Sequence, residues 1–64
     1  MHRVDRIRAE AEVAEADRRV TTAMHLLDQA QQVAEPYRSD RIRQARLELA
    51  VVTGCHARAV AVLA

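Results

Sequence analysis

Apolar residues recur at helical spacing through the middle of the chain, from residue 23 to Pro36. Four of them follow one another at intervals of three or four, and two more widen the stripe: Ala23, Leu27, Ala30 and Ala34, then Met24 and Leu26. This pattern predicts an amphipathic helix with a broad buried face. Pro36 disfavours helical geometry at the residue before it, so we expect this helix to end at Glu35.

Two further segments share one apolar spacing, with residues at i, i+3, i+7 and i+10. Segment 3–16 carries Val4, Ile7, Ala11 and Ala14 in this pattern, and segment 40–53 carries Ile42, Ala45, Leu49 and Val52. Each set lies on one face of a helix, which we expect to be the buried face. Ser39 is a natural N-cap for the second segment, and Gly54 stands where a left-handed C-terminal cap is expected.

The complete pattern therefore predicts four helices, at 3–16, 20–35, 40–53 and 55–63. The weakest boundary is 17–22, which contains no Gly or Pro. Asp17 or Thr21 could cap a new helix there, and the β-branched residues 20–22 lower helix propensity. The alternative is one unbroken helix from residue 3 to residue 35.

The resulting fold class is all-α, with two tandem antiparallel helical hairpins in one small domain spanning residues 1–64. A chain this short buries only about 60% of the surface that its unfolded form exposes, and such chains usually need a disulfide, a metal or a partner. The single cysteine, Cys55, excludes an internal disulfide. We therefore expect a partner chain, or the remainder of a longer protein of which this is a fragment.

Charge and hydropathy narrow the class of function. The formal net charge is only +1, whereas nucleic-acid-binding domains usually carry a marked basic excess, so we expect no direct nucleic-acid partner. No apolar run reaches the roughly 20 residues that span a bilayer, and the N-terminus lacks the apolar core of a signal peptide. We expect a cytoplasmic protein, and the use of Arg without Lys, together with abundant Ala, indicates a GC-rich bacterial genome.

The two halves of the chain also resemble each other. A shift of 36 residues places Ala23 and Leu27 on Ala59 and Leu63, and a period in the thirties with two helices per unit is typical of helical solenoids. Ala23, Leu27, Ala30 and Pro36, and then Gly54 and Ala59, resemble positions of the tetratricopeptide repeat. The phrase that begins A-Q-Q-V-A-E-P is also similar to sensor regions of actinobacterial helix-turn-helix regulators.

The tetratricopeptide resemblance implies a protein-protein interaction or assembly module, with a groove lined by the first helix of each unit. Carried onto this chain, the lining consists of Asp5, Arg8, Glu12, Glu15, Arg41, Gln44 and Glu48, which offers Arg forks for carboxylates of a protein or peptide partner. The alternative is that these charged residues only form solvated helix faces. The second resemblance implies an alternative function, the effector-sensing fragment of a transcription regulator whose DNA-binding part lies elsewhere.

Few residues suggest catalysis or metal binding. A zinc site needs three or four converging ligands, whereas His25 stands far from the adjacent pair Cys55 and His56. No feature of the sequence identifies a base partnered with Cys55, although a position near a helix N-terminus would make it more reactive. We therefore expect no catalytic residue, no metal and no cofactor.

The C-terminal segment 59–64 is apolar on nearly every side. Solenoids normally end in a polar capping helix, and exposure of large apolar side chains forfeits about 1.5 to 3 kcal/mol each relative to full burial. We therefore expect a homo-oligomer interface at Val60, Val62 and Leu63, formed about a two-fold axis.

Overall fold

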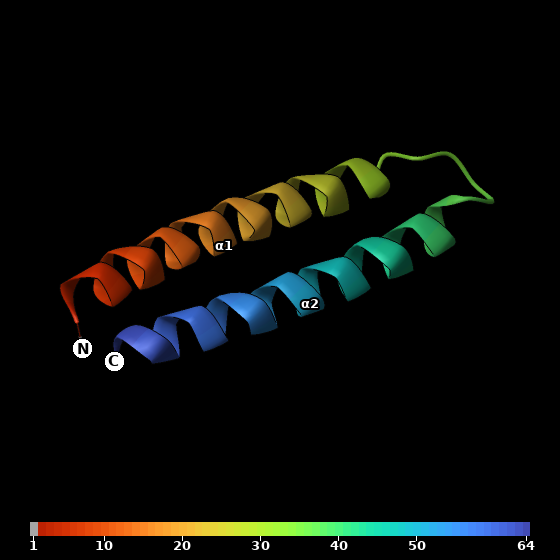
Figure 1. The fold of residues 1–64 in the computed structure, drawn as a ribbon. Helices are drawn as coiled ribbons and strands as arrows, with labels where there is room; N and C mark the ends of the chain where they lie inside the picture. The colour runs from red at the N-terminus through yellow and green to blue at the C-terminus, as the bar shows by residue number, and fades with distance from the viewer. Residues whose placement is uncertain (1) are drawn as a thin grey trace.

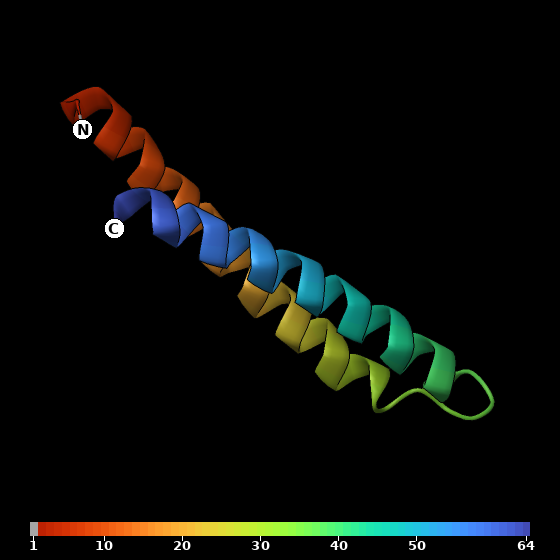
Figure 2. The ribbon, with the colours of Figure 1, turned by 90° about the horizontal axis from the view of Figure 1, so that it is seen from below.

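The computed structural model describes residues 2–64 as one long helical hairpin. Helix α1 spans Arg3–Ala30 and helix α2 spans Arg38–Leu63. They run antiparallel along their full lengths, so that the start of α1 lies beside the end of α2 and the connecting loop lies at the far end (Figures 1 and 2). The molecule measures 52 × 13 × 11 Å along its principal axes. The all-helical class is confirmed, and within residues 2–64 neither helix is long and apolar enough to cross a membrane.

The prediction of four helices is wrong, because both expected internal breaks are continuous helix. Two helices form one hairpin and not two in tandem. Residues 17–22 lie inside α1, where Glu15 pairs with Arg18 and Arg19 one turn further on. Local helix propensity costs only a few tenths of a kcal/mol per β-branched residue, and packing of Val20 against α2 outweighs it.

Gly54 is not a helix cap. It lies in the middle of α2, and its backbone does not adopt the left-handed conformation that a C-terminal cap requires. Glycine in a helix interior costs about 1 kcal/mol relative to alanine, which is small beside the packing of the apolar residues on either side of it. Helix α2 therefore continues through the predicted turn to Leu63.

The loop between the helices begins earlier than predicted. Helix α1 ends at Ala30, not at Glu35, and residues 31–33 form a turn in which backbone amides donate to carbonyls of the last helical turn. The Arg38 side chain closes the loop: its Nε donates to the Val33 carbonyl at 2.9 Å, and its Nη1 lies 3.6 Å from a Glu35 carboxylate oxygen. Tyr37 occupies the N-cap of α2 without a side-chain hydrogen bond, and Ser39, the predicted cap, is inside the helix.

The two helices meet along a continuous seam with a seven-residue repeat. In α1 the buried and half-buried residues alternate in steps of four and three: Ala9, Val13, Ala16, Val20, Ala23, Leu27 and Ala30. The same steps in α2 join Ile42, Ala45, Leu49, Val52, His56, Ala59 and Leu63, and Gly54 and Cys55 beside them are also half-buried. This is the spacing of a left-handed coiled coil. Every second seam residue of α1 is alanine, and these small side chains allow the helices to approach closely.

The predicted buried face of α2 is confirmed, but the one predicted for the start of α1 is wrong. Ile42, Ala45, Leu49 and Val52 lie in the seam, whereas Val4, Ile7, Ala11 and Ala14 face solvent, with Ile7 58% exposed. In the middle segment Ala23 and Ala30 are buried and Leu27 is half-buried, but Met24, Leu26 and Ala34 are exposed. The apolar residues at 4–14 form a second stripe on the opposite side of α1. The side that packs against α2 is the one with the longer apolar row, from Ala9 to Ala30.

One polar pair joins the helices across the seam. The Nε2 atom of His56, which occupies a seam position of α2, lies 2.6 Å from the Oδ1 atom of Asp17 on α1. The other ion pairs among residues 2–64 lie within one helix or at the loop. A polar residue in an otherwise apolar seam fixes which residues lie opposite one another, because any shift of register would separate the pair.

Candidate interaction face

Three hollows lie in a row along one side of the seam, and together they form what we call the groove face. The hollow nearest the loop has a volume of about 360 Å³, the middle one about 330 Å³, and the one nearest the termini about 390 Å³. Their floors are seam alanines and valines, and their rims are charged or amide side chains. They are shallow and open, which suits contact with a protein surface more than enclosure of a small molecule.

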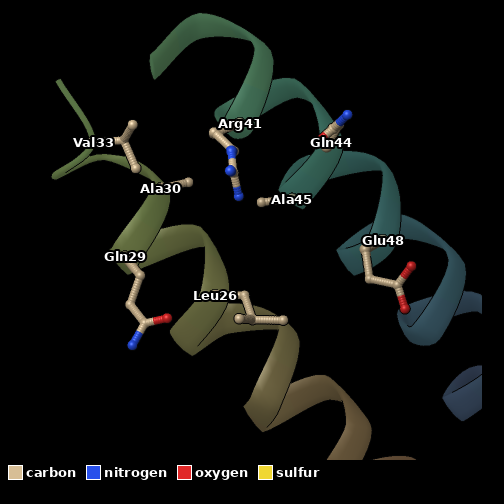
Figure 3. Close-up of a pocket in the computed structure, with 8 residues that line it drawn as sticks. All are labelled: Leu26, Gln29, Ala30, Val33, Arg41, Gln44, Ala45 and Glu48. Atoms are coloured by element: carbon tan, nitrogen blue, oxygen red, sulfur yellow. The ribbon is translucent and has the colours of Figure 1, made fainter. Parts of the chain in front are cut away.

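The hollow nearest the loop combines an apolar floor with one central cation. It is lined by Leu26, Gln29, Ala30, Val33, Arg41, Gln44, Ala45 and Glu48. Figure 3 shows the Arg41 side chain extending between the helices toward Ala30 and Ala45, and Leu26 directed toward α2. Neither Arg41 nor Glu48 has an ion-pair partner among residues 2–64. Both charges are therefore available to a partner.

The other two hollows continue the same arrangement toward the termini. Glu15, Arg19 and Glu48 contribute to the middle hollow, over a floor of Ala23 and Val52. The last hollow is lined by Arg8, Ala11, Glu12, Glu15, Ala16, Arg19, Cys55 and Ala59. Charged residues of both signs thus follow the seam along its length.

A seven-residue spacing organises the rim of the groove face. On α1 the row is Glu12, Arg19 and Leu26, which Val33 continues into the loop, and on α2 it is Arg41, Glu48, Cys55 and Val62. Residues seven apart lie on the same side of a helix in a coiled coil. Each row carries two charges of opposite sign and two apolar or weakly polar residues.

Glu15 is held by two arginines on its own helix. The hydrogen bond from Arg18, followed by the charges of Arg18 and Arg19, lowers the pKa of the Glu15 carboxyl below its ordinary value of 4.5. The Arg19 Nε lies 3.4 Å from a Glu15 oxygen. This network keeps Glu15 ionised at neutral pH and leaves the other nitrogens of Arg19 free to donate outward.

Six of the seven residues predicted to line a partner groove border the hollows, but they are spread along the hairpin. Arg8, Glu12 and Glu15 lie by the hollow nearest the termini, and the other three lie by the hollow nearest the loop: Arg41, Gln44 and Glu48. The helices are antiparallel, so the N-terminal halves of α1 and α2 are at opposite ends. Glu15 and Glu48 share the middle hollow, and Asp5 lines none of the three.

The sequence prediction missed several residues of this face. Arg19, Leu26, Gln29, Val33 and Cys55 all line the hollows. The expected break at 17–22 divided the row that begins at Glu12, and the expected turn at Gly54 separated Cys55 from Arg41 and Glu48. Seven-residue spacing alone predicts Arg19, Leu26 and Val33, since they continue the row that begins at Glu12.

The predicted oligomer residues at the C-terminus point in three directions. Leu63 belongs to the seam and is partly covered by α1, whereas Val60 and Val62 are 42% and 55% exposed. Val62 continues the groove-face row of Cys55, and Val60, two residues earlier, lies on the other flank of α2. These three residues do not form one patch.

The soft ligands and titratable groups of the chain do not converge. The Nε2 atoms of His25 and Gln29 lie 3.2 Å apart on α1, and Arg58 donates to the Cys55 sulfur at 3.3 Å. Within residues 2–64 no three His, Cys, Asp or Glu side chains come close enough to hold one metal ion. The Nε2 atom of His56 pairs with the Asp17 carboxylate.

Comparisons with protein-family models, with curated proteins and with solved structures found no match.

Proposed function

We propose that this hairpin is a non-catalytic assembly module that completes its hydrophobic core against another protein chain. The observation that carries the proposal is the composition of its own core. Within residues 2–64 only five apolar residues are buried, and four of them are alanine: Ala9, Ala16, Ala23, Ala30 and Val52. An alanine side chain adds a single methyl group, worth about 0.8 kcal/mol when buried.

Many of the larger apolar side chains within residues 2–64 are uncovered. Nine of them are exposed: Val4, Ile7, Met24, Leu26, Tyr37, Leu47, Val51, Val60 and Val62. Single exposed apolar residues are common in monomers, but here the exposed set outweighs the buried one. A chain of this size rarely draws more than about 3 to 5 kcal/mol from its core, so burial of even two or three of these side chains would substantially raise its stability.

The proposed mode of packing is that of tetratricopeptide arrays, which the sequence resembles. In such arrays each hairpin buries its faces only against neighbouring hairpins. Uncovered apolar residues on both flanks of the seam, such as Leu26 on one and Met24 on the other, suit a hairpin that is contacted by other helices. Under this proposal the hairpin as a whole would be the packing unit, since each helix is about twice the length predicted for the sequence repeat.

The proposal is tested by the behaviour of the chain at high dilution. Circular dichroism at low micromolar concentration should show less helix than α1 and α2 contain, a broad thermal transition, and binding of a dye that reports exposed apolar surface. A monomer that is fully helical, unfolds cooperatively and binds no dye would contradict the proposal, since it would need no covering chain.

A further inference from the structure

We infer that the groove face binds the groove face of a second copy of this chain, with the two hairpins reversed end to end. This inference rests on the proposed function and names its partner. It is carried by the order of charges along the groove face, which is self-complementary under a half-turn.

Residues of α1 and α2 that line the same hollow lie at the same position along the long axis of the hairpin, which we call a level. Val33 and Arg41 line one hollow, Leu26 and Glu48 share two hollows, and Arg19 and Cys55 share another. Each pair therefore lies at one level of the hairpin. One seven-residue step further, Glu12 is level with Val62.

Within the two seven-residue rows, the charge at successive levels from the loop to the termini is positive, negative, positive and negative. The residues in this order are Arg41, Glu48, Arg19 and Glu12. Reversal of the hairpin gives the opposite order, so a second copy turned end to end places Glu12 at the level of Arg41 and Arg19 at the level of Glu48. Counting the residues of the two rows from both copies, every level then contains one Arg, one Glu and two uncharged side chains.

The rest of the groove face fits the same half-turn. The hollow nearest the loop faces the one nearest the termini, and their volumes are similar, about 360 and 390 Å³. At the centre, Thr22 and Val51 meet their own copies, and Val51 is 61% exposed in the single chain. Such a patch, in which residue i meets j and j meets i, is what a two-fold dimer requires.

The available length is sufficient for a specific dimer. From the level of Val33 to that of Glu12 the face is about 32 Å long at 1.5 Å per residue, and two helices make it roughly 20 Å wide. Such a contact covers about 1,300 Å² over both partners, which falls within the range of specific interfaces. Charge pairs at the helix rims set which chain binds and in which direction, as they do in coiled coils.

The charge pairing can be tested by two single reversals, Glu12→Arg and Arg41→Glu. Neither residue has an ion-pair partner within residues 2–64, so the hairpin should tolerate both changes. Each variant alone places like charges together at both ends of the dimer, and its dissociation constant should rise at least about tenfold. An equimolar mixture of the two variants restores opposite charges at both ends and should associate as tightly as wild type. Sedimentation equilibrium measures all three.

Matched controls come from the other flank of the seam. Asp28→Arg and Arg46→Glu change the net charge by the same amounts, and both residues are exposed and outside the three hollows. These variants should dimerise like wild type. If Glu12→Arg and Arg41→Glu associate as tightly as wild type, or their mixture no more tightly than either alone, the reversed arrangement is overturned.

The wild-type result separates this inference from the proposed function. Wild type that stays monomeric, with incomplete helix and bound dye, overturns the second copy as occupant while the need for a covering chain stands. A monomer that is fully helical and stable overturns both. Wild-type association that is insensitive to the groove-face charges overturns only the interface.

Discussion

Two rows of residues on α1 share the same spacing and differ in everything else. The seam row is Ala9, Ala16, Ala23 and Ala30, and the groove row is Glu12, Arg19 and Leu26, which Val33 continues into the loop. The first row is buried against α2, and the second borders the hollows. Small uncharged side chains in the seam allow close approach of any similar helix, whereas the charges beside it discriminate between partners and directions. The first row therefore brings the helices together, and the second is the one that can select a further chain.

Of the changes that distinguish the two rows, enlargement of a seam alanine should have the largest effect on the stability of the hairpin. Ala23 is 2% exposed, and Ala23→Leu adds three carbon atoms where α2 lies against it. Overpacking of this kind costs about 1 to 3 kcal/mol, a large part of the stability of so small a core. Thermal unfolding followed by circular dichroism should show a clearly lower midpoint.

The control for this change is Thr21→Leu, which enlarges an exposed residue on the outer side of the same helix. Its effect should stay within about 0.5 kcal/mol. Equal midpoints for Ala23→Leu and Thr21→Leu would mean that the seam is not closely packed at Ala23.

A smaller effect of opposite sign is expected at Gly54. A Cβ atom added there would meet only Arg58 Nη1, at the ordinary contact distance of 3.6 Å, and the backbone does not have positive φ. Gly54→Ala should therefore raise the free energy of unfolding by up to about 1 kcal/mol through helix propensity. Chemical denaturation measures the change. A loss of stability would contradict this expectation and would mean that the added methyl group is not accommodated at Gly54.

The smallest effect concerns Glu15 and its arginines beside the groove row. The folded-state pKa of Glu15 lies below its ordinary value of 4.5, so its ionised form is favoured in the folded helix. This stabilisation is complete at neutral pH and is lost as the pH falls below 4.5 through the folded pKa. The difference in melting midpoint between wild type and Glu15→Gln should therefore shrink in acid, and it should shrink also in high salt because the groups are exposed. A constant difference between pH 7 and pH 3 would exclude this ionic contribution.

The sequence prediction was wrong about α1 because it used the apolar periodicity of short segments. Val4, Ile7, Ala11 and Ala14 satisfy helical periodicity as well as the true seam does, so no local test distinguishes the two stripes. The row from Ala9 to Ala30 is distinguished only by its length, since it continues at seven-residue spacing through all of α1. Division of the helix at 17–22 concealed this continuity and, with it, half of the groove face.

The sequence by itself determined that the chain is helical, that the helices turn near Pro36, and which side of α2 is buried. Each of these depends on local chemistry: helix-forming residues, one proline, and a single apolar stripe over Ile42 to Val52. The tertiary structure decided the length of both helices, the buried side of α1 and the juxtaposition of Glu15 with Glu48. The physical reason is that weak local preferences, such as those at Gly54 or Thr21, are worth at most about 1 kcal/mol and yield to packing between helices that are distant in sequence.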